Sequence, residues 1–128
     1  MQGAVLITGA TSGFGAASAR CLARQGWPLI LCGRRLERLQ ALVDELSELT
    51  AVLPLQLDVR DAIAVQRAID DLPEPFSGIQ VLVNNAGLAL APGPAQAVEL
   101  SDLHTMIDTN ITGLVNMTHA VLPRLIAG

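Results

Sequence analysis

Residues 6–15, LITGATSGFG, pass from an apolar run to residues with almost no side chain. Gly9, Gly13 and Gly15 permit a tight turn, a close approach of the backbone to an anion, and close packing of a helix on a strand. Unpaired N–H groups at the first turn of such a helix attract negative charge. We expect this segment to bind a phosphate group; the alternative is a glycine-lined loop without a ligand. A P-loop is excluded because it needs a lysine, and the sequence has none.

Two arginines follow the second apolar run, in the segment LCGRRLERL. An NAD site places an acidic residue about 20 residues beyond the glycines, where it binds the ribose 2′-hydroxyl. Cys32 and Gly33 occupy that region, and Arg34 and Arg35 follow, which favours the 2′-phosphate of NADP. The missing acid also disfavours an S-adenosylmethionine methyltransferase. The alternative is that Arg34, Arg35 and Arg38 form the solvated face of the next helix.

Short apolar runs alternate with segments of helical period, and these elements must position the glycines and arginines. Strands are predicted at residues 4–8, 29–32 and 52–57, and a fourth begins at residue 81. A helix is predicted over residues 13–25, ended by Gly26. A second helix has an apolar face formed by Leu36, Leu39, Val43, Leu46 and Leu49.

Two further helices complete the predicted pattern. Asp61 is the expected N-cap of a helix that carries Ile63, Ile69 and Leu72. A long helix is predicted from Ser101, bent or ended at Pro123. The loop before it contains Pro92, Gly93 and Pro94.

The order strand, helix, strand, helix without a hairpin signal predicts parallel pairing with right-handed crossovers. The expected fold is a Rossmann-like, doubly wound α/β sheet in one domain over residues 1–128. In the usual strand order 3-2-1-4-5-6, about four strands reach just past the reversal, so we expect an incomplete sheet whose fourth strand is an apolar edge.

Composition excludes several function classes. The net charge is −4, and all eight basic residues are arginines, so no basic field favours nucleic acid or a membrane surface. Cys21 and Cys32 have no CxxC or histidine-rich partner, so we expect neither a metal site nor a disulfide and place the protein in the cytoplasm. No signal peptide or membrane span is predicted.

Four motifs occur in order: TGATSGFG at residues 8–15, LDVR at 57–60, NNAG at 84–87 and NITG at 110–113. In type and spacing they resemble the motifs of the classical short-chain dehydrogenases/reductases, and the resemblance spans the whole chain. The segments GRRLERLQ, NNAGLAL, MIDTN and AVLP are similar to the NADP-dependent branch that oxidises serine, allo-threonine and related 3-hydroxy acids such as 3-hydroxypropionate.

The resemblance implies roles for individual residues. NADP contacts are expected from Gly9, Ala10, Thr11, Ser12, Gly13, Phe14 and Gly15, together with Arg34 and Arg35. Asp58 would accept a hydrogen bond from the adenine amino group, with the backbone of Val59 nearby; a plain turn residue is the alternative for Asp58. The ribose and pyrophosphate would be lined by Asn85, Ala86 and Gly87. Asn84 would tie neighbouring strands through its amide.

One catalytic residue is implied. Asn110 resembles the helix asparagine that anchors a water in the family's proton relay; an amide that caps or bends a long helix is the alternative. The family moves a hydride between the nicotinamide and a carbinol carbon, while a tyrosine of a Tyr-x-x-x-Lys motif transfers the proton. This sequence contains no tyrosine and no lysine.

We therefore expect the 128 residues to be the cofactor-binding half of a dehydrogenase for a small-molecule substrate, truncated before the Tyr-x-x-x-Lys segment. A partner chain that supplies the remainder and a non-catalytic NADP-binding module are the alternatives. The family implies a homo-oligomer, a dimer or tetramer, for the full-length protein.

Overall fold

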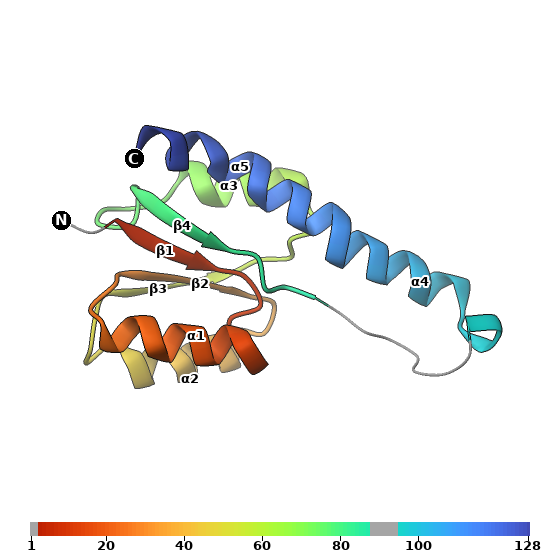
Figure 1. Ribbon diagram of the computed structural model, residues 1–128, viewed down its shortest axis with the longest axis horizontal. Helices are drawn as coiled ribbons and strands as arrows, with labels where there is room; N and C mark the ends of the chain where they lie inside the picture. The colour runs from red at the N-terminus through yellow and green to blue at the C-terminus, as the bar shows by residue number, and fades with distance from the viewer. Residues whose placement is uncertain (1–2, 88–94) are drawn as a thin grey trace.

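Four parallel strands form the sheet in the order β3, β2, β1 and β4, and the computed structural model describes residues 3–87 and 95–128 (Figure 1). The strands are β1 (Ala4–Ile7), β2 (Leu29–Gly33), β3 (Val52–Gln56) and β4 (Ile79–Val83). The helices that connect them are α1 (Gly13–Arg24), α2 (Leu36–Leu46) and α3 (Ala62–Asp70). The strand order reverses between β1 and β4, as the doubly wound Rossmann-like prediction requires, so that prediction is confirmed.

From residue 95 onward, most of the described chain is helical. A short 3-10 turn η1 (Ala95–Ala97) precedes α4 (Leu100–Ile107), the π-helical turn η2 (Asp108–Thr112) and α5 (Gly113–Ala127). Figure 1 shows α4 continuing the line of α5 away from the sheet. The predicted loop at Pro92, Gly93 and Pro94 lies outside the described residues.

The two faces of the sheet carry different helices, with α1 and α2 on one face and α3 and α5 on the other (Figure 1). Successive side chains of a strand point to opposite faces, so Val5 and Ile7 pack toward α1 and α2, while Leu6 packs toward α3 and α5. All four residues of β1 are buried. A central strand covered on both faces needs this continuous apolar sequence.

Two predicted helix ends are confirmed. The Asp61 carboxylate accepts a hydrogen bond from the backbone N–H of Ala64 at 3.0 Å, which caps α3. Gly26 follows the end of α1 with φ at +84°, the left-handed conformation that stops a helix. These caps direct the chain back toward β2 and into α3.

The predicted apolar faces of α2 and α3 are partly wrong. Leu39, Val43 and Leu46 are buried, but Leu36 and Leu49 are half-exposed, and Leu49 lies beyond the end of α2. Ile63 is 69% exposed, because the α3 residues that face the sheet are Val65 and Ile69. Apolar residues at the ends of these helices are therefore in contact with solvent.

Pro123 was predicted to bend or to end the last helix, and the helix does not end there. The helix continues through Pro123 to Ala127. Arg124 Nη1 donates to the carbonyl oxygen of Ser77 at 2.6 Å, and Leu125 packs against the core, so tertiary contacts hold the turn that follows the proline. The departure from α-helical geometry lies at η2, and at Gly113, the first residue of α5, a Cβ would stand 2.4 Å from Val59 Cγ2. Helix α5 therefore approaches the loop after β3 with little space between them.

The described sheet ends at β4, whose Val81 is partly exposed, as expected for an apolar edge. Within residues 3–87 and 95–128, no helix has both the length and the apolar character needed to cross a bilayer.

Candidate functional site

In the turn between β1 and α1, the backbone of Gly15 lies close to the backbone of Gly9. A Cβ on Gly15 would stand 2.2 Å from the Gly9 carbonyl oxygen and 2.6 Å from Asn85 Nδ2, so only glycine fits there. Gly13, the first residue of α1, has φ at +45°. Ser12 precedes it and uses no side-chain oxygen to cap the helix. The first turn of α1 therefore opens toward solvent at the carboxyl end of β1.

The ends of β1 and β4 are tied by one buried hydroxyl. Thr8 Oγ1 accepts hydrogen bonds from the backbone N–H groups of Asn85 at 3.0 Å and Ala86 at 2.9 Å. The Asn85 amide in turn donates to the Gly9 carbonyl oxygen at 3.0 Å. These bonds fix the glycine-rich turn relative to the segment that follows β4.

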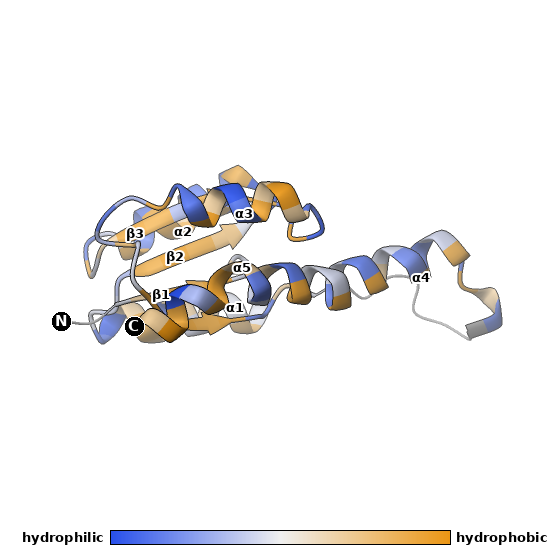
Figure 2. Ribbon diagram, turned by 90° about the horizontal axis from the view of Figure 1, so that it is seen from above, coloured by the Kyte–Doolittle hydropathy of each residue, from blue (hydrophilic) through white to orange (hydrophobic). Residues whose placement is uncertain are grey.

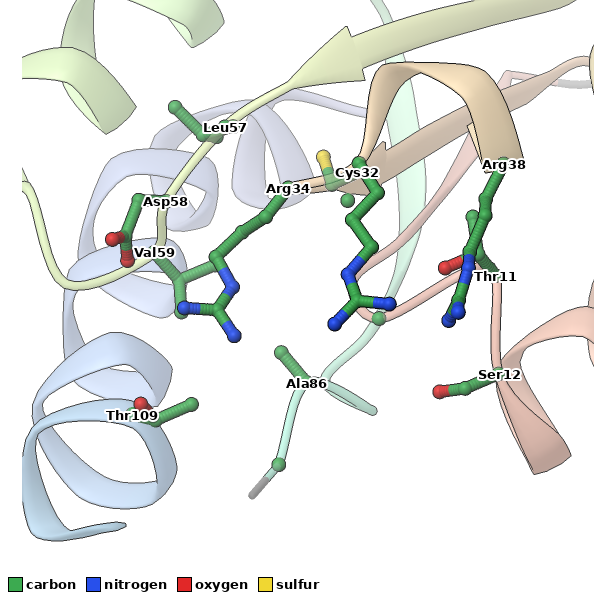
Figure 3. Close-up of a pocket in the computed structure, with 14 residues that line it drawn as sticks. Thr11, Ser12, Cys32, Arg34, Arg38, Leu57, Asp58, Val59, Ala86 and Thr109 are labelled. Carbon is green, nitrogen blue, oxygen red and sulfur yellow. The ribbon is translucent and has the colours of Figure 1, made fainter. Parts of the chain in front are cut away.

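A pocket of about 200 Å³ lies at the carboxyl ends of the strands, where the strand order reverses (Figure 3). Each of the four strand ends and the π-helical turn η2 contributes to its wall. The lining residues are Gly9, Thr11, Ser12, Cys32, Gly33, Arg34, Arg35, Arg38, Leu57, Asp58, Val59, Ala86, Gly87 and Thr109. Open α/β sheets bind ligands at this position.

Three arginines give this pocket a positive wall. Arg34, Arg35 and Arg38 all line it, and Figure 3 shows the guanidinium groups of Arg34 and Arg38 reaching into the open space. The ion pairs of the described residues join Arg20 to Glu45 and Arg60 to Asp58, so none of these three is paired there. Arg34, Arg35 and Arg38 are exposed, as on a solvated helix face, but they also share a concave site with the glycine-rich turn, which favours a phosphate-binding role.

One carboxylate stands in the same pocket. Asp58 is paired with Arg60, whose Nη2 lies 2.7 Å from Asp58 Oδ2. The hydrogen bonds from Arg60 lower the pKa of Asp58, partial burial opposes this, and the charge of Arg34 lowers it further. Asp58 is therefore an ionised acceptor at neutral pH.

Two further residues that line the pocket, Cys32 and Thr109, are uncharged. Burial raises the pKa of the Cys32 thiol to about 12, so the thiol is neutral. Thr109 Oγ1 is buried without a hydrogen-bond partner, although the residue lines the pocket. A ligand with a hydrogen-bonding edge could satisfy this hydroxyl.

The predicted site residues divide into two groups. Those that line the pocket are Gly9, Thr11, Ser12, Arg34, Arg35, Asp58, Val59, Ala86 and Gly87. Those that do not line it are Ala10, Gly13, Phe14, Gly15, Asn85 and Asn110. Ala10 is buried and donates its N–H to the Cys32 carbonyl oxygen at 3.1 Å, whereas Phe14 is 86% exposed.

Asn110 lies within η2, beside the segment after β4. A Cβ on Gly87 would stand 3.5 Å from Asn110 Oδ1. Asn84 donates from its amide to Thr118 Oγ1 at 3.1 Å, so it ties the end of β4 to α5. From the sequence, Asn84 was instead predicted to tie neighbouring strands.

Five residues that line the pocket were not predicted as site residues: Cys32, Gly33, Arg38, Leu57 and Thr109. Arg38 lies in the first turn of α2, close in the sequence to Arg34 and Arg35, so the sequence carried a signal for it. Thr109 carried no signal, because only the packing of η2 beside the end of β4 brings it to the pocket.

The donor set fits a dinucleotide that bears an additional phosphate. Backbone at the start of α1 suits a pyrophosphate, since a helix start favours anions. Guanidinium groups suit a phosphate monoester, which accepts paired, charge-assisted hydrogen bonds.

Comparison with known proteins agrees with this geometry. The family model described as short chain dehydrogenase matches residues 3–128. Sulfoacetaldehyde reductase 2 of Chromohalobacter salexigens is 66% identical over 126 residues, which cover 98% of this chain and 50% of that protein. Serine 3-dehydrogenase of Agrobacterium fabrum is 53% identical over 126 residues, again 98% of this chain and 50% of that protein.

A solved structure is similar throughout the described fold. The closed form of serine dehydrogenase complexed with NADP+ superposes with a TM-score of 0.87 at 48% identity, covering 96% of this chain and 49% of that one. The chain spans about half the length of the curated relatives it matches. Four motifs occur in order, the strand order reverses, and the family model matches residues 3–128. The chain therefore belongs to the short chain dehydrogenase family.

Proposed function

We propose that this chain is the NADP-binding half of an oxidoreductase that acts on a small hydroxy acid or the corresponding carbonyl compound. The observation that carries the proposal is the wall of Arg34, Arg35 and Arg38 in one pocket with the glycine-rich turn. A relative complexed with NADP+ supports the choice of coenzyme. When bound, NADP supplies or accepts the hydride.

The chain's own residues bind and orient the coenzyme. The start of α1 would hold the pyrophosphate, and Arg34, Arg35 and Arg38 would hold the 2′-phosphate. Asp58 would accept a hydrogen bond from the adenine amino group. Asn110 would anchor a water of the proton relay, a role supported by its position in the π-helical turn beside Gly87.

The coenzyme assignment is tested by binding. The variant Arg34→Ala with Arg35→Ala is expected to bind NADPH at least about tenfold more weakly, because charge-assisted hydrogen bonds contribute about 1.5–3 kcal/mol each. Binding of NADH is expected to change little. Fluorescence titration of the chain with both coenzymes measures these affinities.

The control for this test is Arg24→Ala with Arg67→Ala, which removes the same charge from exposed positions on α1 and α3. It is expected to bind both coenzymes like the wild type. Equal losses of NADPH and NADH binding in the Arg34 and Arg35 variant would overturn the assignment.

The names of the relatives support the proposed substrate class. Serine dehydrogenase and sulfoacetaldehyde reductase, by their names, act on small molecules that carry an acid group near a hydroxyl or carbonyl carbon. Serine, allo-threonine, 3-hydroxypropionate and sulfoacetaldehyde are therefore the substrates to compare. Turnover of any of them by the full-length protein with NAD that exceeds turnover with NADP would contradict the proposal.

Catalysis requires groups that these 128 residues lack, since the sequence has no tyrosine and no lysine. We expect the purified chain to bind NADP without oxidising serine, and NADP-dependent turnover by the pure chain would contradict this. A non-catalytic NADP-binding module, or a chain that needs a partner, is the second candidate. The nucleotide sequence beyond codon 128 discriminates them, because an onward frame encoding Tyr-x-x-x-Lys favours a longer enzyme.

Self-association is part of the proposal. Apolar side chains remain exposed along α4, η2 and α5, and Figure 2 shows hydrophobic residues recurring along these helices. They are Leu100, Leu103, Ile107, Ile111, Leu114, Val115, Leu122 and Ile126. A face of this kind favours association, here with a second copy of the chain.

A further inference from the structure

We propose that Arg60 is a positioning residue, which holds the Asp58 carboxylate so that the pocket selects a nucleotide base carrying an exocyclic amino group. This inference rests on the proposed function, because it takes the adenosine of the coenzyme as the occupant of the pocket.

Arg60 holds the carboxylate at both oxygens. Its Nε lies 3.0 Å from Asp58 Oδ1 and 3.1 Å from Oδ2, and its Nη2 lies 2.7 Å from Oδ2. The backbone N–H of Arg60 also donates to Oδ1 at 3.0 Å. Three donors therefore fix one carboxylate in a paired, planar geometry.

The hydrogen bonds from Arg60 leave the Asp58 carboxylate able to bind a ligand. An ionised carboxylate has about four lone-pair sites, and three N–H donors leave at least one of them open. The side chains of Arg60 and Asp58 are 35% and 36% exposed, and Asp58 lines the pocket. A base that presents an N–H group there can donate a further hydrogen bond to the Asp58 carboxylate. A base that presents a carbonyl at the same point cannot, because both groups are acceptors.

Arg60 also keeps Asp58 from pairing with the wrong arginine. Arg34 lines the same pocket and acts electrostatically on Asp58. Figure 3 shows the Asp58 carboxylate turned away from the Arg34 guanidinium, which reaches into the open space. Without Arg60, the carboxylate would be free to turn toward Arg34, which would remove an acceptor from the base and a donor from the 2′-phosphate.

Removing the Arg60 side chain should leave the fold intact. The loop at Asp58 is fixed by its backbone, since Leu57 N–H donates to the Gly33 carbonyl oxygen at 2.9 Å and Asp61 N–H donates to the Asp58 carbonyl oxygen at 3.1 Å. The neighbouring helix α3 has its own N-cap in Asp61. A change in ligand choice at Arg60 is therefore separable from a loss of folding.

The experiment compares NADPH with its hypoxanthine analogue, in which a carbonyl replaces the adenine amino group. Dissociation constants are measured for the wild-type chain and for Arg60→Gln, Arg60→Lys and Asp58→Asn. Arg67→Gln is the matched control, because Arg67 is an exposed arginine on α3 outside the pocket.

The wild type and the control are expected to prefer NADPH over the analogue by roughly tenfold, the contribution of one charge-assisted hydrogen bond. In Arg60→Gln, as in Asp58→Asn, this preference is expected to fall to within about threefold, and Arg60→Lys is expected to restore part of it. A structural role for Arg60 would weaken both nucleotides equally and leave their ratio unchanged, which would overturn the inference.

The outcomes separate the two proposals. Failure of the wild type to bind NADPH in preference to NADH would refute the proposed function. Preferential binding of NADPH, with the same base preference in the wild type and in Arg60→Gln, would refute the role of Arg60 alone.

Discussion

Gly15 shows, at the scale of single residues, how little room the glycine-rich turn leaves. Replacing it with alanine would put a Cβ 2.2 Å from the Gly9 carbonyl oxygen, so α1 or the turn must shift. We expect Gly15→Ala to lower the free energy of unfolding by about 1–3 kcal/mol, as overpacking does. NADPH binding should weaken as well. Chemical denaturation and a binding titration measure the two effects.

Gly78→Ala is the control, because a Cβ at Gly78 meets nothing within 4 Å and the residue lies far from the pocket in the chain. It is expected to retain wild-type stability within about 0.5 kcal/mol. A Gly15→Ala variant as stable as Gly78→Ala would contradict the tight approach at the turn.

The Asp58 pKa sets a second prediction at this scale. The pKa is lowered in the folded chain, chiefly by hydrogen bonds from Arg60, so the ionised form stabilises the fold. This contribution is fully present above the usual pKa of 3.8 and is lost as the pH falls through the lowered folded value. Asp58→Asn should therefore unfold at a lower temperature than the wild type at pH 7, and the difference should shrink as the pH falls below 3.8 and disappear below the lowered folded pKa. A difference that grows on acidification would contradict the assignment.

The N-cap of α3 is a test at the scale of elements. Asp61 accepts the Ala64 N–H, and Asp61→Ala leaves that donor without a protein partner. The free energy of unfolding is expected to fall by about 1 kcal/mol, the usual contribution of a cap. Asp71→Ala, at the opposite end of the same helix, is expected not to destabilise, since an acid there opposes the helix dipole. Denaturant titrations of both variants decide this, and equal losses would argue against the cap.

Local signals along the chain were sufficient to predict most of these elements. The apolar runs at β1 and β2, the glycine that ends α1 and the acid that caps α3 act over a few residues, so their consequences can be derived without the fold. What sequence reasoning missed depends on tertiary packing. The last helix continues through Pro123 because Arg124 and Leu125 are held by distant residues.

The functional site shows the same difference between what local sequence signals predict and what depends on tertiary packing. Arg34 and Arg35 could be predicted from their distance to the glycines, because the βα unit itself sets that spacing. Thr109 reaches the pocket only because η2 packs beside the end of β4, and no local pattern predicts that contact. The Asp58 and Arg60 pair is local, but its geometry at both carboxylate oxygens became visible only in the structure.

At the scale of the whole molecule, the main feature is the apolar surface exposed along α4, η2 and α5. Ile126 is 77% exposed and Leu122 lies one turn before it on α5. We expect the chain to associate through this face and Leu122→Glu with Ile126→Glu to lower its average mass in sedimentation equilibrium, because charges there oppose burial. Ile63→Glu, on the exposed side of α3, is the control and should leave the mass unchanged. A wild-type chain that sediments as a monomer would contradict the prediction.

The central claim is that the pocket at the carboxyl ends of β1, β2 and β3 binds a 2′-phosphorylated adenosine. Titration of the isotopically labelled chain with 2′,5′-ADP and with 5′-AMP, followed through its backbone amide resonances, tests this claim most directly. The account predicts shifts at Gly9, Ser12, Arg34 and Asp58, and an affinity for 2′,5′-ADP at least about tenfold higher than for 5′-AMP. Equal affinities, or shifts confined to residues outside the pocket, would contradict it.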